Sequence, residues 1–250
     1  MNRLAGKRAL MTGAGGQLGS DLCRAFAAEG ADLVLTTRAS AKLEPLAQEI
    51  RDMGVRAETI AADFTTNEDI DRLAREAWDA FGGIDIVILS SQPPEPNLGS
   101  LVTTSDEDWQ DQFQSIVWGP LRLMRQLAPH MMDAGGGSVI TFTSSTGFDP
   151  IEGYAAYGLA KAGLWNLTMY MAREWGEDGI RVNALQPGLI ATGDDYDERQ
   201  RSASKHGVLA RTSLARLGRN AECTGAAIHL ASDESSFTSG QRIAVDGGRF

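Results

Sequence analysis

The chain has 250 residues, 42% of them hydrophobic, and a formal net charge of −10. This length supports one sizeable core, and no linker-like run divides the sequence, so we expect a single domain over residues 1–250. The acidic balance argues against a nucleic-acid partner, because phosphate backbones attract basic surfaces. No apolar run reaches the roughly 18 residues that span a membrane, and the N-terminus lacks a signal-peptide pattern. The sequence therefore predicts a cytoplasmic protein with no membrane partner.

Strand and helix patterns alternate along the chain. Seven short apolar runs are typical of buried strands, at residues 8–12, 32–37, 57–63, 84–90, 138–143, 180–186 and 241–246. Helical spacings of apolar residues lie between them, over 18–26, 43–50, 70–81, 106–132, 154–177 and 220–231. This alternation predicts an α/β fold of the doubly wound Rossmann type, a parallel sheet of about seven strands with helices on both faces. Ligands of such folds bind at the carboxyl ends of the strands.

A glycine-rich segment, TGAGGQLGS, lies where the first strand ends and the first helix begins. Glycines let the backbone turn sharply and approach a pyrophosphate, and the helix N-terminus supplies free N–H groups. We therefore expect a dinucleotide phosphate site, with Gly13, Gly15, Gln17, Leu18 and Gly19 as its members. Such a turn is also compatible with a tight connection that binds nothing.

The end of the second strand indicates which dinucleotide binds. Proteins that select NAD carry an acidic residue here that reaches the ribose 2′-hydroxyl, whereas this chain has Thr37 followed by Arg38. A guanidinium beside hydroxyl groups suits a 2′-phosphate through charge-assisted hydrogen bonds. We expect NADP(H), with NAD(H) less favoured, although an arginine at this place can also stack on the adenine of either cofactor.

Tyr157 and Lys161 lie four residues apart in a predicted helix, and Ser144 ends the strand before it. The i,i+4 spacing places the phenol and the ammonium on one helical face, where a nearby cation is expected to lower the tyrosine pKa. Such a tyrosine can exchange a proton with an alcohol oxygen. The serine hydroxyl can hold the same oxygen while a hydride arrives from a cofactor. The tyrosine and lysine alone also occur by chance in helices, as a surface ring covered by a lysine stem.

Metal and disulfide chemistry have little support in the sequence. Cys23 and Cys223 fall in helical patterns that predict buried free thiols. His130, His206 and His229 share no ligand-like spacing with one another or with a cysteine, so we expect no metal site.

In order and spacing, these segments resemble the short-chain dehydrogenase/reductase family. The resemblance covers essentially the whole chain and rests on TGAGGQLG, TSSTG, YGLAK, NALQPGLIAT and the C-terminal RLGR, LASD and VDGG. It implies an oxidoreductase for a ketone or secondary alcohol, with Ser144, Tyr157 and Lys161 catalytic and with Tyr157 and Lys161 also at the cofactor. It implies further cofactor contacts at Asp63, Phe64, Pro187, Gly188, Ile190 and Thr192.

The chain departs from the family pattern at three places. Gln17 stands where TGxxxGxG has its middle glycine, and LSSQ at residues 89–92 replaces NNAG, leaving the Ser90 hydroxyl to meet the cofactor. Ile116 stands where the family has an asparagine that holds a water in the proton relay from the lysine to solvent. An isoleucine side chain has no polar group for that task. Backbone carbonyls or the hydroxyls of Ser90 and Ser91 are expected to hold a substitute water.

Two function classes remain open at this point. The intact trio of serine, tyrosine and lysine favours an NADP-dependent oxidoreductase. The departures also allow a non-redox relative, either a lyase similar to the halohydrin dehalogenases or a cofactor-binding regulatory protein. We favour the oxidoreductase, because dehalogenase-like relatives replace the lysine and lose the dinucleotide site.

The substrate side is expected to consist of loops at residues 92–96, 145–154 and 193–215, the last resembling the family's mobile lid. An apolar wall is predicted from Phe148, Ile151, Tyr154 and Leu189. The lid also carries four basic residues, Arg199, Arg201, Lys205 and His206. They could meet an anionic substrate, but we favour a solvated helix face paired with Asp194, Asp195, Asp197 and Glu198. The family also implies a homotetramer, in whose contacts Trp118, Trp165, Met169 and Phe250 are candidates.

Overall fold

The computed structural model describes residues 2–39, 41, 43–93, 99–191, 195–205 and 208–249. Its centre is a seven-stranded parallel sheet in the order β3-β2-β1-β4-β5-β6-β9. The strands are β1 (Arg8–Thr12), β2 (Asp32–Thr37), β3 (Ala57–Ala61), β4 (Ile86–Leu89), β5 (Gly137–Phe142), β6 (Ile180–Pro187) and β9 (Arg242–Val245). The predicted doubly wound fold is confirmed, and each of the seven predicted strands is present.

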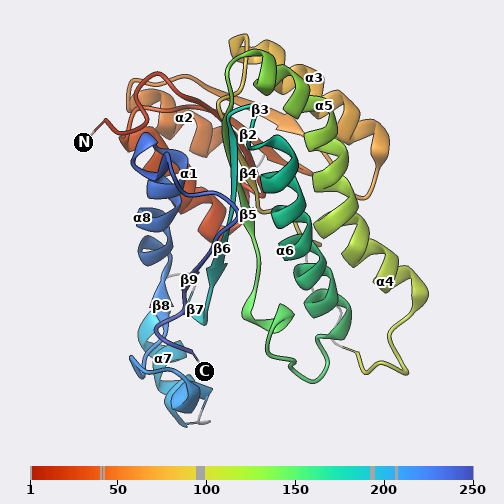
Figure 1. The fold of residues 1–250 in the computed structure, drawn as a ribbon. Helices are drawn as coiled ribbons and strands as arrows, with labels where there is room; N and C mark the ends of the chain where they lie inside the picture. The colour runs from red at the N-terminus through yellow and green to blue at the C-terminus, as the bar shows by residue number, and fades with distance from the viewer. Residues whose placement is uncertain are drawn as a thin grey trace.

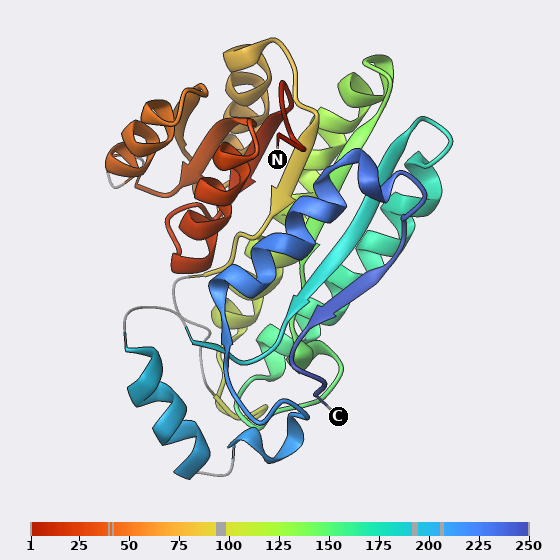
Figure 2. The same ribbon diagram turned by 90° about the vertical axis from the view of Figure 1, so that its left-hand side faces the viewer.

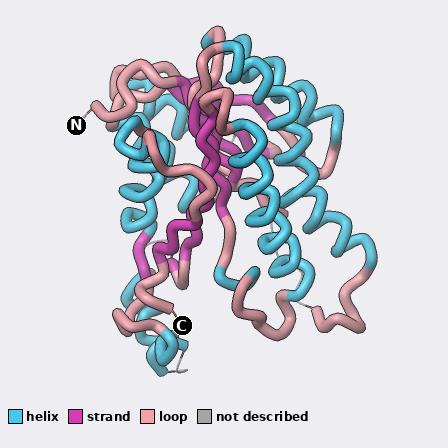
Figure 3. The backbone as a smooth tube through the Cα atoms, viewed as in Figure 1, coloured by secondary structure: helices cyan, strands magenta, loops and turns pink. Residues whose placement is uncertain are grey.

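Helices cover both faces of the sheet (Figures 1 and 3). One face carries α1 (Gln17–Ala28), α2 (Glu44–Asp52) and α8 (Asn220–Ala231), and Figure 2 looks onto this face. The other face carries α3 (Asn67–Phe81), α5 (Gly119–Asp133) and α6 (Ala155–Trp175). In the part of the chain that the structure describes, no helix is both long enough and apolar enough to cross a membrane.

Strand side chains alternate between two hydrophobic cores. In β1, Met11 belongs to the core beneath α1, α2 and α8, whereas Leu10 belongs to the core beneath α3, α5 and α6. In β4, Ile88 belongs to the first of these cores and Val87 to the second. Successive side chains of a strand point to opposite faces. Because both faces are covered, the strands are nearly continuous apolar runs, which is why the sequence predicted them.

The strand order reverses beside β1, and this reversal positions the candidate site. The chain runs outward from β1 to β2 and β3, then crosses back to β4 and continues outward on the other side. The register pairs Thr12 with Thr36 of β2 and Met11 with Ile88 of β4. These strands therefore end at the same edge. A crevice opens at such a switch point, outside the carboxyl ends of the strands.

The helix predicted over residues 106–132 is three consecutive elements. α4 (Asp106–Phe113) and α5 are joined by a π-helical turn at Gln114–Trp118. The hydroxyl of Ser105 caps α4 by accepting the N–H of Asp108 at 3.1 Å. The turn lengthens the hydrogen-bonded step to i→i+5 without changing which residues are apolar, so periodicity does not reveal it. Ile116 lies within this turn.

The segment after β6 contains two short strands that were not predicted from the sequence. β7 (Ile190–Ala191) pairs with β8 (Gly218–Arg219), and between them lie α7 (Tyr196–Lys205) and a 3₁₀ turn (Val208–Arg211). Strands this short carry no alternating pattern. Leu209 and Leu217 pack with Ala191 in a separate apolar cluster, so this segment has a core of its own. In Figures 1 and 2, α7 lies beyond the carboxyl ends of the strands.

Candidate active site

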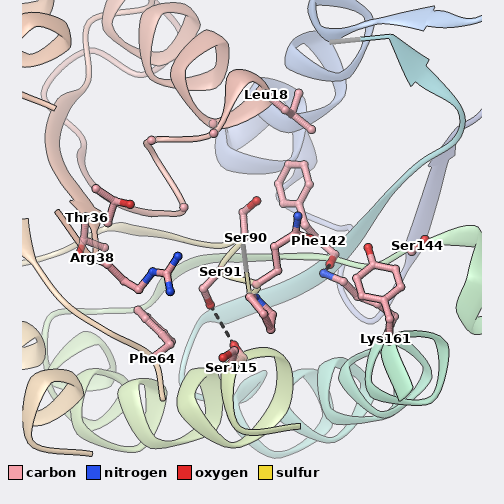
Figure 4. Close-up of a pocket in the computed structure, with 18 of the residues that line it drawn as sticks. Leu18, Thr36, Arg38, Phe64, Ser90, Ser91, Ser115, Phe142, Ser144 and Lys161 are labelled. Atoms are coloured by element: carbon pink, nitrogen blue, oxygen red, sulfur yellow. Dashed lines mark hydrogen bonds between the residues drawn. The ribbon is translucent and has the colours of Figure 1, made fainter. Parts of the chain in front are cut away.

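A cavity of about 680 Å³ lies at the carboxyl ends of the strands, beside β1 and β4. Every predicted site residue that the structure describes lines it (Figure 4). They are Gly13, Gly15, Gln17, Leu18, Gly19, Thr37, Arg38, Asp63, Phe64, Ser90, Ser144, Tyr157, Lys161, Pro187, Gly188 and Ile190. Thr192 lies outside the described residues. Segments far apart in the sequence therefore meet around one cavity.

The glycine-rich loop is held against the end of β4. The hydroxyl of Thr12 accepts the N–H groups of Ser90 and Ser91, at 2.9 and 3.1 Å. Gly13 has a φ of +72°, and a Cβ there would lie 2.6 Å from the carbonyl oxygen of Ser90. A Cβ at Gly19 would overlap the carbonyl of Gly13. Both positions therefore require glycine, which explains the part of the motif that this chain keeps.

The first turn of α1 faces the cavity. Gln17, Leu18 and Gly19 form this turn and line the cavity. The first N–H groups of an α-helix have no partner within the helix, and the helix dipole is positive at this end. The Gln17 side chain is exposed, so a residue larger than glycine at this position does not fill the loop. This arrangement suits an anionic ligand such as a pyrophosphate.

The ends of β2 and β3 form another wall of the cavity. Thr36, Thr37 and Arg38 line it from β2, which ends without a carboxylate. Figure 4 shows the guanidinium of Arg38 projecting into the cavity beside Phe64. The Asp63 carboxylate accepts the N–H and the hydroxyl of Thr65, at 2.9 and 2.8 Å. Asp63 is therefore held in place by its own loop.

Ser144 and Lys161 lie across the cavity from Arg38 (Figure 4), and Tyr157 lines the cavity beside Lys161. Ser144 follows β5, and its side chain interacts with that of Tyr157 so as to lower the phenol pKa. Its hydroxyl also accepts the hydroxyl proton of Thr146, at 3.0 Å. The Nζ of Lys161 lies 5.5 Å from the centre of the Tyr157 ring. The structure thus places a hydroxyl, a phenol and an amine around one point, as the sequence predicted.

Burial is the largest influence on the pKa values of the Tyr157 phenol and the Lys161 amine. It raises the pKa of Tyr157 above its usual value, and the Ser144 hydrogen bond opposes this with a smaller lowering. Lys161 is buried, and the loss of hydration lowers its pKa to about 7. The expectation that Lys161 lowers the pKa of Tyr157 is therefore wrong, because the desolvation of the phenol outweighs the other effects on it. A phenol that stays protonated at neutral pH is suited to donate a proton.

The π-helical turn closes one side of this group. Ile116 is fully buried in a small apolar cluster, against which the Tyr157 ring packs. The backbone carbonyl of Ser115 accepts a hydrogen bond from the hydroxyl of Ser91, at 3.1 Å. Ser91 and Ser115 both line the cavity. The apolar side chain of the turn thus contacts the phenol, while a polar backbone group of the same turn faces the cavity.

The expected substrate walls are only partly at the cavity. Gln92 and Pro93 line it, whereas residues 94–96 lie outside the described part of the chain. The Tyr154 ring meets Tyr157 edge-on, with centroids 6.4 Å apart. Phe148 does not line this cavity; the guanidinium of Arg242 covers its ring at 3.7 Å. Leu189 and Ile151 are also absent from the lining, and Leu189 packs in the cluster after β6.

The described basic residues of the lid are exposed, as predicted, and one of them, Arg199, has the predicted acidic partner. No side chain of α7 is buried, and Arg199 pairs with Asp195 at 2.7 Å. His206 and Asp194 lie outside the described residues. Beyond α7, Arg211 and Arg249 both pair with Asp149, at 3.1 and 3.2 Å. One carboxylate therefore connects the loop after β5, the end of the lid and the C-terminal segment.

Cys23 and Cys223 are buried free thiols, as predicted, and burial raises the pKa of both, that of Cys223 to about 11. Among the residues that the structure describes, no group of three or more His, Cys, Asp or Glu side chains is arranged to hold a metal ion.

Several lining residues were not predicted from the sequence, including Thr36, Asp111, Ser115, Phe142 and Thr143. A signal existed for some of them. Asp111 and Ser115 are spaced i,i+4, which places them on one face of a helix, and Thr36 and Thr143 are polar residues at predicted strand ends. The expectation that Ser91 holds a water rested only on its position after the fourth predicted strand. Its hydrogen bond to Ser115 depends on the π-helical turn, for which no sequence signal exists.

Comparison with known proteins agrees with this geometry. A family model described as enoyl-(acyl carrier protein) reductase matches residues 13–249. An uncharacterized oxidoreductase of Mycobacterium tuberculosis is 38% identical over 249 residues, which cover 99% of this chain and 94% of the relative.

This chain belongs to the short-chain dehydrogenase/reductase family. It is therefore an oxidoreductase of that family.

Solved structures of this family show what related proteins bind. L-sorbose reductase from Gluconobacter frateurii, in complex with NADPH and L-sorbose, has a TM-score of 0.90 and 29% identity, and the match covers 100% of this chain and 99% of the reductase. 7α-Hydroxysteroid dehydrogenase, in complex with NADH and 7-oxo glycochenodeoxycholic acid, has the same TM-score and identity, with 99% and 96% covered. These short-chain dehydrogenases/reductases thus use nicotinamide cofactors of both kinds.

The buried lysine of this short-chain dehydrogenase/reductase predicts a pH dependence of folding. Below pH 7, Lys161 is charged in both states, and the folded state bears the full cost of burying that charge. Between pH 7 and the unfolded value of 10.5, the folded lysine loses its proton while the unfolded one keeps it. Stability therefore rises with pH across this window. Relative to Lys161→Met, wild-type protein should gain about 2 kcal/mol of unfolding free energy from pH 7 to pH 9.

Urea unfolding of both proteins at the two pH values measures this difference. The Lys161→Met variant is the matched control, because every other titrating group is common to both proteins. Equal changes in unfolding free energy for the two proteins would show that Lys161 titrates normally in the fold.

Proposed function

We propose that the protein transfers a hydride between NADP(H) and a small ketone or secondary alcohol. The observation that carries this proposal is the placement of Ser144, Tyr157 and Lys161 in the wall of a cavity that also contains the glycine-rich loop. Reduction of a carbonyl group needs a hydride and a proton at the same bond. A proton donor and a dinucleotide cradle in one cavity meet both needs.

The lining residues fit a nicotinamide dinucleotide. Gly13 and Gly19 cannot carry a side chain where the loop turns, and the first turn of α1 offers N–H groups to a pyrophosphate. We assign the remaining contacts to Gly15, Gln17 and Leu18 at the phosphates, Asp63 and Phe64 at the adenine, Ser90, Tyr157 and Lys161 at the nicotinamide ribose, and Pro187, Gly188, Ile190 and Thr192 at the nicotinamide. The bound cofactor supplies the hydride.

The choice of NADP(H) over NAD(H) rests on the end of β2. Thr37 and Arg38 line the cavity there, and Arg38 is exposed toward it. A guanidinium binds a phosphate through paired, charge-assisted hydrogen bonds. No carboxylate is present at the end of β2 to bind the ribose 2′-hydroxyl or to repel a 2′-phosphate.

In the proposed reaction, each of the three catalytic residues has one task. The Ser144 hydroxyl holds the carbonyl oxygen. As hydride adds to the carbonyl carbon, the electron pair of the C=O π bond moves to the oxygen, and Tyr157 donates its phenol proton there to give the alcohol. The resulting phenolate takes a proton from Lys161, which then draws one from water. Burial raises the pKa of Tyr157, so the phenol holds the proton that reduction consumes.

The non-redox alternative, a dehalogenase-like lyase or a regulatory protein, has less support. It would require the trio and the glycine-rich loop to share a cavity without a reaction that uses both. Their common cavity favours the oxidoreductase.

Replacement of Tyr157 tests the proposed chemistry. Tyr157→Phe should lower turnover in NADPH-dependent ketone reduction by 10² or more, because it removes the hydroxyl that donates the proton, while NADPH still binds. Tyr154→Phe is the matched control; it deletes the same atom from the neighbouring ring and should retain most turnover. A Tyr157→Phe enzyme with nearly normal turnover would refute the assignment.

Exchange of the residues at the end of β2 tests the cofactor. The double variant Thr37→Asp and Arg38→Gln should shift preference toward NADH, because a carboxylate repels the 2′-phosphate and the cation is lost. Steady-state kinetics with both cofactors measure the shift, and Thr37→Ser with Arg38→Lys is the charge-preserving control. Wild-type enzyme that uses NADH better than NADPH would contradict the proposal.

We also propose that residues 1–250 form a single domain with 193–215 as a substrate lid, and that the protein is a cytoplasmic homotetramer. Exposed apolar side chains on the π-helical turn and α6 support the assembly: Trp118 is 57% exposed and Tyr170 is 61% exposed. Trp165 is partly buried within the chain and supports it less. Phe250 lies outside the described residues.

Light scattering tests the assembly. We expect a mass four times that of the 26.8 kDa chain, because closed symmetric association covers the exposed apolar side chains. A single species with the mass of one chain would contradict it.

A further inference from the structure

We propose that the Ser91 hydroxyl, fixed by the carbonyl of the π-helical turn, is a positioning residue that orders the cavity water through which Lys161 exchanges protons with solvent. The inference rests on the proposed function, because only turnover requires this exchange.

Lys161 needs a route to solvent that its own position does not provide. The residue is only 2% exposed, and each reduction withdraws one proton from it. Within the described part of the chain, its one hydrogen-bond acceptor is the carbonyl of Phe142, at 2.6 Å. An ammonium has three N–H donors. With one donor on Phe142 and one given to the nicotinamide ribose in the function proposed above, one donor remains. Lys161 lines the cavity, and an unpaired buried donor is costly, so water in the cavity is the partner for that last donor.

Ser91 is held in a position to order that water. Its N–H donates to the hydroxyl of Thr12 at 3.1 Å, and its hydroxyl donates to the carbonyl of Ser115 at 3.1 Å. A serine hydroxyl has a single proton, so this bond fixes its direction and leaves oxygen lone pairs free to accept. Ser91, Ser115 and Lys161 line the same cavity (Figure 4). A water that donates to Ser91 and accepts from Lys161 has the two partners that a bound water needs.

The π-helical turn explains why a hydroxyl from the loop after β4 orders the water. The inward side chain of the turn is Ile116, which is fully buried against the phenol and offers no hydrogen bond. Ser115 of the same turn lines the cavity, and its backbone carbonyl accepts the hydroxyl of Ser91. The neighbouring Ser90 does not have this role. Figure 4 shows its hydroxyl pointing toward Leu18, away from Ser115.

Deletion of the Ser91 hydroxyl tests the proposal. In NADPH-dependent ketone reduction, Ser91→Ala should lower kcat roughly tenfold, less than loss of the proton donor itself. It should raise the solvent deuterium isotope effect on kcat, because proton supply becomes rate-limiting. The dissociation constant for NADPH should stay within about twofold of wild type. Ser91→Thr, which keeps a hydroxyl, should restore kcat, and imidazole, a small proton carrier, should partly rescue Ser91→Ala.

Ser90→Ala is the matched comparison, since it removes the same atom one residue earlier. Its effect should fall on NADPH binding and leave the solvent isotope effect unchanged. Thermal melts and NADPH titration of each variant separate a folding or binding defect from a loss of proton supply.

Three results would overturn the proposal. The first is a Ser91→Ala variant with the kcat and isotope effect of wild type. If Tyr157→Phe is still inactive in that case, the proposed function stands and only the role of Ser91 is refuted. A loss of kcat that follows weakened NADPH binding, and that neither Ser91→Thr nor imidazole restores, would make Ser91 a purely structural residue. A wild-type protein that reduces no member of a broad ketone panel with NADPH or NADH would defeat the proposed function first, and this inference with it.

Discussion

The arrangement of the site depends on the buried hydrogen bond from Lys161 to the carbonyl of Phe142. It ties α6 to the end of β5, so that Tyr157, one turn earlier on the helix, reaches the Ser144 hydroxyl that follows the same strand. An ammonium in this position is costly, because little water reaches it. This cost is seen in the lysine pKa, which burial lowers to about 7. The same burial keeps the phenol protonated, which is the state that carbonyl reduction requires.

Much of this architecture could be predicted because it arises from patterns within single segments. Strands buried on both faces are apolar runs, and a helix places residues four apart on one face, so the strands and the Tyr157–Lys161 pair were evident. Three features depend on contacts between segments and were missed. They are the π-helical turn, the Ser91–Ser115 bond that depends on it, and the two-residue strands after β6. The direction of the Tyr157 pKa was also wrong, because burial cannot be measured from residue spacing.

The departures from the family pattern have different consequences. The Gln17 side chain is exposed, so the requirement for glycine at Gly13 and Gly19 is unaffected. Ile116 stands where the family has a polar side chain, and it packs against the phenol. In our proposal the polar role passes to Ser91, in the loop after β4. Fold similarity does not decide the cofactor, since close structural relatives hold either NADH or NADPH. Only the side chains at the end of β2 carry that choice in this account.

The most direct test of the central claim is a titration of Lys161 itself. The chain has only four lysines, so ¹³Cε-labelled lysine gives a simple NMR spectrum, in which Lys161→Met identifies the signal. The account predicts a midpoint near pH 7 for this carbon, the value set by burial. A midpoint near 10.4, the usual value for a hydrated lysine, would contradict it. The ammonium would then be solvated, and burial would no longer explain how the site controls its protons.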